Sequence, residues 1–172
     1  MRCTTLAVIG LFGAVFVASS ANAHITLENR QASPGSYYKA VFAVPHGCAG
    51  SATVKIRVQI PEGVIAVKPM PKAGWSVETV KGKYAASFEY HGATISEGVK
   101  EVIWSGGKLP DDNYDEFVAA TYLTAALKPS TMLYFPVVQE CEQGVSRWIE
   151  LPSEGKPEGK SPAPGVKLAP KP

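Results

Sequence analysis

The sequence predicts an all-β protein in which two sheets pack face to face as a sandwich. Short runs rich in β-branched and aromatic residues follow one another, and glycine- or proline-containing breaks separate them. In residues 54–60, apolar and polar residues alternate, which is typical of a strand with one buried face. No segment shows a sustained helical period. These observations favour an immunoglobulin-like or cupredoxin-like β-sandwich.

Each strand is predicted where Val, Ile, Thr, Phe, Tyr and Trp are locally enriched. In chain order the strands cover residues 25–28, 37–44, 53–60, 75–80, 84–90, 99–104, 116–124, 132–139 and 145–150. Residues suited to turns or loops separate them at 33–35, 45–50, 61–63, 81–83, 106–107 and 128–130. No internal repeat is visible, so we expect one β domain.

The N-terminal residues 1–23 have the features of a secretory signal peptide. Arg2 supplies a positive charge, residues 6–17 are apolar, and Ala21-Asn22-Ala23 has the small residues of a cleavage site. The mature chain is therefore expected to begin at His24. No other apolar run approaches the roughly 20 residues of a membrane span, which predicts a periplasmic protein without stable membrane insertion.

The composition changes after Leu151. Residues 152–172 are rich in proline and lysine and contain no aromatic residue, so we expect them to form a disordered tail or spacer. A partner-docking role for Pro162-Ala163-Pro164 is the alternative interpretation. The predicted organisation is thus a signal peptide (1–23), a β domain (24–151) and a tail (152–172).

Net charge and cysteine content limit the function classes. The formal net charge is only +2, and there is no concentrated basic patch of the kind that nucleic-acid or lipid-surface binding needs. Cys3 lies in the predicted signal peptide, which leaves Cys48 and Cys141 as a pair in an oxidising compartment. A disulfide is the default expectation, and a redox-active or metal-binding thiol pair is the alternative.

No enzyme motif is visible in the sequence. The chain lacks a G-x-S-x-G nucleophile elbow and a glycine-rich phosphate loop before a helix, so neither hydrolase nor nucleotide chemistry has support. We therefore expect a protein that is not an enzyme.

Cleavage before His24 would create a candidate metal ligand. The free α-amine and the imidazole would then lie on one residue and could chelate one ion together. The pKa of an ordinary α-amine is about 7.7 to 8.0, low enough for a strongly binding divalent ion to displace the proton. Nitrogen ligands favour copper(II), which heads the divalent affinity series. The alternative is an N-terminal histidine that frays in solvent.

The remaining histidines and methionines form no metal motif. His46 lies in a predicted turn and His91 follows a predicted strand, without H-x-H or H-x-x-x-H spacing. Met70 and Met132 are isolated and are expected to fill core or edge positions.

Two further segments contain candidate site residues. Residues 111–117 hold four carboxylates at the entry to a strand, where alternation predicts Asp115 and Phe117 on one face and Glu116 on the other. Trp148 lies on the last short strand, and packing in the sandwich core is its simplest interpretation.

Four segments together resemble the YcnI family of bacterial secreted copper-binding proteins. They are His24-Ile25-Thr26-Leu27, Pro45-His46-Gly47-Cys48, Asp115-Glu116-Phe117 and Val145-Ser146-Arg147-Trp148. Their order and spacing cover nearly the whole of residues 24–151.

The resemblance implies a mononuclear copper(II) site of the monohistidine-brace type. In such a site His24 gives its amine and a ring nitrogen, Glu116 completes the protein ligands, and Trp148 packs beside the metal. It also implies a disulfide between Cys48 and Cys141, as in proteobacterial members. The function implied is copper sequestration or delivery in copper homeostasis, with a membrane copper importer, an oxidase-assembly partner or another periplasmic copper protein as partner.

Two other functions are left open by the sequence. The first is a copper-dependent oxidative enzyme resembling lytic polysaccharide monooxygenases, in which His46 or His91 would supply a second imidazole. The second is a metal-free interaction module, a frequent role of sandwich folds.

Overall fold

The structure, a computed structural model, describes residues 24–153 and 159–170. The predicted signal peptide, residues 1–23, lies outside the described residues. The described chain forms strands and loops, and none of its segments is a helix long and apolar enough to cross a membrane. The strands are β1 (Thr26–Leu27), β2 (Gln31–Ala32), β3 (Ser36–Val44), β4 (Thr53–Gln59), β5 (Val64–Pro69), β6 (Ser76–Tyr90), β7 (Ala93–Leu109), β8 (Asp115–Leu123), β9 (Met132–Tyr134), β10 (Val137–Cys141), β11 (Val145–Trp148) and β12 (Gly165–Leu168).

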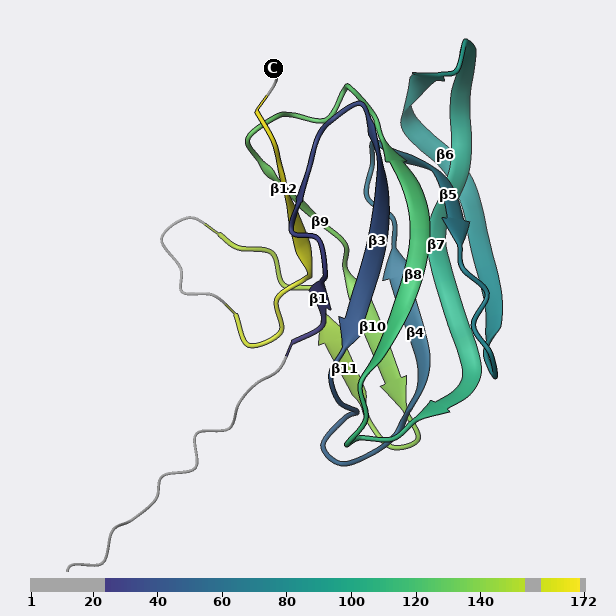
Figure 1. Ribbon diagram of the computed structural model, residues 1–172, viewed down its shortest axis with the longest axis vertical. Helices are drawn as coiled ribbons and strands as arrows, with labels where there is room; N and C mark the ends of the chain where they lie inside the picture. The colour runs from purple at the N-terminus through teal and green to yellow at the C-terminus, as the bar shows by residue number, and fades with distance from the viewer. Residues whose placement is uncertain (1–23, 154–158, 171–172) are drawn as a thin grey trace, which may run out of the picture.

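Two sheets pack face to face, which confirms the predicted sandwich (Figure 1). One sheet has the order β1-β3-β8-β5, and the other has the order β11-β10-β4-β7-β6. A third, small sheet with the order β2-β12-β9 lies beside them. Strands β1 and β11 are therefore edge strands of different sheets.

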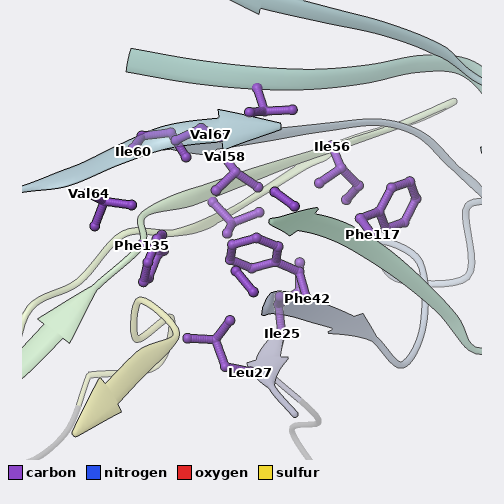
Figure 2. Close-up of a cluster of buried hydrophobic side chains, with 14 of the residues drawn as sticks. Ile25, Leu27, Phe42, Ile56, Val58, Ile60, Val64, Val67, Phe117 and Phe135 are labelled. Carbon is purple, nitrogen blue, oxygen red and sulfur yellow. The ribbon is translucent and has the colours of Figure 1, made fainter. Parts of the chain in front are cut away.

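The core fills the space between the two large sheets (Figure 2). Ile56 and Val58 of β4 point inward, as their alternation with polar residues predicts, and both are fully buried. Phe42 of β3 and Phe117 of β8 are register partners and fill the core from the opposite sheet. Burying such a side chain stabilises the fold by roughly 1.5 to 3 kcal/mol.

Two predicted turns lie inside strands instead. Residues 81–83 belong to β6, where the pairing with β7 shifts after Val80, so Gly82 lies beside a bulge and not in a turn. Gly107 belongs to β7 and lies against the indole of Trp75, where a Cβ atom would come within 2.1 Å of the ring. The close approach of the Trp75 ring explains why residue 107 is a glycine.

Strand β5 was not predicted, and the single strand expected over residues 132–139 is divided into β9 and β10. Within β5, Ala66 has a positive φ of 51°, and the pairing with β8 shifts between Ile65 and Lys68. This irregularity interrupts the period-two pattern that would have revealed the strand.

The prediction of a disordered tail is wrong for residues 159–170, because they contain β12. This strand pairs in parallel with β2 and antiparallel with β9. Val166 and Leu168 are buried at 0% and 1% exposure, whereas Lys167 between them is exposed. The domain therefore extends beyond the predicted boundary at residue 151. The other residues of the predicted tail, 154–158 and 171–172, lie outside the described part of the chain.

Candidate functional site

His24 enters the fold directly before β1. It and Thr26 are half-buried, whereas Ile25 and Leu27 are buried, so the strand alternation extends back to His24. The ring nitrogen Nε2 of His24 lies 3.2 Å from the carbonyl oxygen of Lys160. A carbonyl oxygen can only accept a hydrogen bond, so Nε2 carries the proton in this contact. In the neutral ring, Nδ1 then holds the lone pair that a metal would need.

Trp148 of β11 packs against two histidines. The His24 ring meets the indole edge-on, with a centroid distance of 5.5 Å, and the His46 ring does so at 6.4 Å. The indole is also a buried part of the main core. The core packing expected of Trp148 is therefore confirmed, and its indole also contacts His24. Its place beside a metal stays a prediction.

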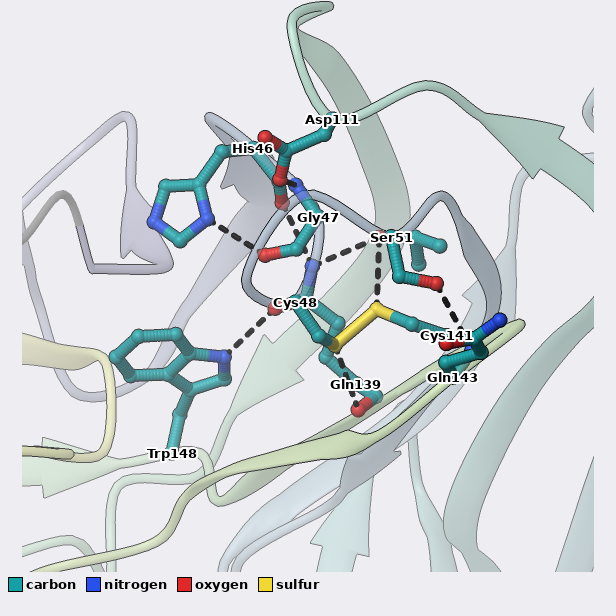
Figure 3. Close-up of a disulfide and its surroundings, with 10 residues drawn as sticks. His46, Gly47, Cys48, Ser51, Asp111, Gln139, Cys141, Gln143 and Trp148 are labelled. Carbon is teal, nitrogen blue, oxygen red and sulfur yellow. Dashed lines mark hydrogen bonds between the residues drawn. A yellow bond between two sulfur atoms is a disulfide. The ribbon is translucent and has the colours of Figure 1, made fainter.

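The indole is held by Gln139 of β10, a residue that the sequence analysis missed. Trp148 Nε1 donates to Gln139 Oε1 at 2.9 Å (Figure 3). The Gln139 amide nitrogen donates to the His46 carbonyl and to Thr53 Oγ1, both at 2.7 Å. Gln139 is fully buried at an inward position of β10, between Val137 and Cys141. A polar residue within that apolar alternation was the signal that could have identified it.

The loop over residues 45–50 is fixed beside this network. Cys48 and Cys141 form a disulfide with a Cα–Cα distance of 5.9 Å, which confirms the predicted pairing. Closing a loop with a sequence separation of 93 stabilises the fold by roughly 4 to 5 kcal/mol in the chain-entropy model. Asp111 accepts a hydrogen bond from the Gly47 amide at 3.0 Å, so one of the predicted acidic residues anchors the same loop.

Glu116 lies on the same outer sheet face as His24, two strands away. It is the register partner of Ala43 in β3, which in turn is the partner of Thr26 in β1. Two strand spacings place the Thr26 and Glu116 backbones about 10 Å apart. Ala43 between them has the smallest side chain that keeps a Cβ, which leaves room above β3 for a carboxylate. The structure records no direct contact between Glu116 and His24.

The Glu116 carboxylate accepts a hydrogen bond from the Tyr114 hydroxyl at 2.5 Å. This hydrogen bond, with a smaller contribution from burial, raises the pKa of Tyr114 to about 12. Because Tyr114 contacts Oε1, it orients the carboxylate, while Oε2 can serve as a metal ligand. Tyr114 was not identified from the sequence.

Asp115 and Phe117 point to the opposite face from Glu116, as predicted. Lys72 Nζ forms an ion pair with Asp115 at 2.6 Å and lies 5.1 Å from the centroid of the Phe117 ring. The same ammonium donates to the Glu116 carbonyl oxygen at 3.1 Å. Lys72 therefore fixes the backbone that presents Glu116.

His91 and the methionines occupy other environments. His91 is at the β6–β7 turn, where its Nε2 lies 2.8 Å from the Tyr37 hydroxyl and its ring contacts Tyr90. Met70 and Met132 are 52% and 44% exposed, so neither fills the core. Met132 and His24 line the same cavity of about 510 Å³.

The described residues contain no group of three or more His, Cys, Asp or Glu side chains that could hold a metal ion. The brace expected from the sequence needs only two such side chains, His24 and Glu116, because its third ligand is a main-chain amine. The donor set suits copper(II), since it combines imidazole and amine nitrogens with one carboxylate.

Comparisons with known proteins agree with this architecture. A family model described as "Domain of unknown function (DUF1775)" matches residues 24–168. None of the curated proteins matches the chain. One solved structure, "Crystal structure of an uncharacterized protein from Nocardia farcinica reveals an immunoglobulin-like fold", aligns with a TM-score of 0.63 and 24% identity. The alignment covers 85% of this chain and 98% of that one, and it shows a shared immunoglobulin-like fold.

Proposed function

This chain belongs to the DUF1775 family, and on that premise we propose that its mature form is a periplasmic copper(II)-binding protein that resembles the YcnI proteins. It would sequester copper, or pass it to a membrane importer, an oxidase-assembly partner or another periplasmic copper protein. The proposal requires cleavage between Ala23 and His24, since the ligand amine exists only after that step.

One observation carries the proposal: the arrangement around the His24 ring. Nε2 donates to Lys160, and the ring edge packs on Trp148, so the imidazole is fixed with Nδ1 as the lone-pair nitrogen. The α-amine and Nδ1 of one histidine can close a six-membered chelate ring with a metal ion. An ordinary α-amine deprotonates close enough to neutral pH for copper(II) to displace its proton.

Glu116 is the proposed third protein ligand. Its carboxylate would neutralise one charge of the dication. It lies on the same sheet face as His24, on the far side of β3, where Ala43 separates Glu116 from Thr26. Two nitrogens and one oxygen leave coordination positions for water or for a ligand from a partner. Such open positions suit a protein that accepts and releases copper.

Trp148 would shield one side of the site from water. Its indole N–H is already satisfied by Gln139, so the ring can present an apolar surface. The same ring could hold reduced copper(I) by a cation–π contact.

A copper-dependent oxidative enzyme is the second candidate, and one observation favours it. His46 packs on the same indole as His24, so a second imidazole lies beside the proposed site. Oxygen-dependent release of oxidised sugars by the copper-loaded protein would support this function. Copper binding with no such products would exclude it for the polysaccharides tested.

The direct test is a copper(II) titration of the processed chain beside His24→Ala and Glu116→Ala variants. We expect one tight site per chain, a tetragonal nitrogen-rich electron paramagnetic resonance spectrum, and loss of the tight site in His24→Ala. Glu116→Ala should weaken binding or change the spectrum, whereas Glu78→Ala, which removes an exposed carboxylate, should do neither. An unchanged titration for Glu116→Ala would exclude Glu116 as the carboxylate ligand and leave Asp112 as the candidate, because Asp115 points to the opposite face and pairs with Lys72.

A further inference from the structure

We propose that residues 159–168, which comprise β12 and the residues that lead into it, are part of the metal site and hold the His24 imidazole ready to bind. This inference rests on the proposed function and adds a positioning element to it. The segment follows the four motifs in the sequence, and its composition gave no sign of a role at the site.

The contact between the segment and His24 is a hydrogen bond to the main chain. Nε2 of His24 donates to the Lys160 carbonyl oxygen, while the edge of the same ring packs on Trp148. A ring held at one nitrogen and along one edge has little freedom to rotate. Outer-shell hydrogen bonds of this kind orient metal-binding histidines and set which ring nitrogen carries the proton.

Glu150 fixes the part of the segment that carries Lys160. Its main chain exchanges hydrogen bonds with the segment, donating to the Ser161 oxygen at 3.1 Å and accepting from the Ala163 amide at 2.9 Å. Its carboxylate accepts from the Ser161 amide at 2.9 Å. Gly159 approaches the same carboxylate so closely that a Cβ atom there would lie 1.8 Å from Oε2. Lys160 is thus held from both sides.

The rest of the segment is anchored in the domain. Val166 and Leu168 are buried, and the Phe135 amide donates to the Pro164 oxygen at 2.9 Å. Pro162 to Gly165 and His24 line the same cavity of about 510 Å³, so the segment forms a wall beside the histidine. A rigid wall at this place keeps the Lys160 carbonyl in position before any metal arrives.

The test compares Glu150→Ala with Glu150→Gln in the processed, full-length chain. Glutamine keeps an oxygen that can accept from the Ser161 amide, whereas alanine removes it. Glu150→Pro removes the carboxylate and also the amide that donates to Ser161. Glu62→Ala is the matched control, because Glu62 likewise accepts from a main-chain amide, that of Ala85 at 2.8 Å, in another part of the fold.

Two measurements are made on each protein. In the metal-free form, nuclear Overhauser contacts between the His24 ring and the α-protons of Lys160 and Ser161, with a protected Hε2 proton, report the hydrogen bond. Competition with a chelator gives the copper(II) affinity. We expect the contacts to be lost, and the affinity to fall by about tenfold or more, in Glu150→Ala and Glu150→Pro. Glu150→Gln and Glu62→Ala should keep both.

The inference is wrong if the wild type shows no His24–Lys160 contact, if the contact persists in Glu150→Pro, or if it is lost without a change in affinity. These outcomes differ from failure of the proposed function. If the proposed function is wrong, the wild type itself has no tight copper site. The contacts in the metal-free protein then still report whether the segment holds His24.

Discussion

At the scale of single residues, the carboxylate of Glu116 has two interactions, one with Tyr114 and a proposed one with the metal ion. Its Oε1 accepts the Tyr114 hydrogen bond, and in the proposed site its charge also attracts the metal ion. The same charge keeps the phenol of Tyr114 protonated. Tyr114 is 59% exposed, so its titration can be followed in the folded protein.

We predict that Glu116→Ala, which removes the hydrogen-bond acceptor, lowers the pKa of Tyr114 from about 12 towards its usual value of 10. The hydrogen bond stabilises the neutral phenol, so its contribution to folding is complete below the ordinary pKa and is lost as the pH rises through the raised one. Phenolate absorbance during an alkaline titration, with Tyr114→Phe as the reference, measures the shift. An equal Tyr114 pKa in wild type and Glu116→Ala would contradict the hydrogen bond.

A second prediction concerns the small side chain of Ala43. Ala43 lies between Thr26 and Glu116 on the sheet face that also carries His24, so a leucine there would crowd the Glu116 carboxylate. Ala43→Leu should therefore weaken copper(II) binding by about tenfold or more while the domain stays folded. Ala120→Leu is the matched control, since Ala120 is an exposed residue of β8 whose side chain points to the same sheet face. Equal copper affinities of the two variants, measured by chelator competition, would argue against Glu116 as a ligand.

At the scale of elements, β12 decides how far the domain extends. Val166 is fully buried and belongs to the main core, whereas Lys167 beside it is exposed. We predict that Val166→Ala lowers the free energy of unfolding by roughly 2 kcal/mol, through lost burial and an unfilled cavity. Lys167→Ala should change it by less than about 0.5 kcal/mol. Urea unfolding measures both, and equal values would mean that β12 adds nothing to the core.

The strands that the sequence revealed are those whose packing agrees with a regular pattern. The period-two alternation of residues 54–60 predicts β4 because its central part follows the pattern, with Ile56 and Val58 buried and Arg57 and Gln59 less so. Strand β12 escaped prediction because only Val166 and Leu168 alternate with Lys167, within a segment whose composition resembles that of disordered chains. Its stability comes from pairing with β2 and β9, which are distant in sequence.

The residues of the candidate site likewise include some that the sequence indicated and some that it did not. The sequence indicated His24 and Trp148, and the structure brings their rings together. The sequence could not indicate Gln139, Tyr114 or Lys160 as partners of the site residues, because each acts through a contact that only the fold creates. The Lys160 contact uses a main-chain oxygen, for which side-chain identity carries no information.

At the scale of the whole molecule, the candidate site gathers parts of all three sheets. His24 precedes β1 of the four-stranded sheet, Trp148 ends β11 of the five-stranded sheet, and Lys160 lies on the segment that leads into β12. Strands β1, β11 and β12 lie on the same side of the sandwich (Figure 1), and there His24 contacts Trp148 and Lys160, which are more than 120 positions away in the sequence. An edge position would leave a bound metal accessible to a partner, as the proposed copper delivery requires.

The measurement that tests the central claim most directly compares two N-termini on the same domain. One chain begins at His24 and the other keeps Ala23, which turns the His24 amine into an amide and leaves the side chains of the site unchanged. We predict a tight copper(II) site with a nitrogen-rich paramagnetic resonance spectrum in the first chain, and a much weaker site with a different spectrum in the second. Equal affinity and identical spectra in the two chains would contradict the account.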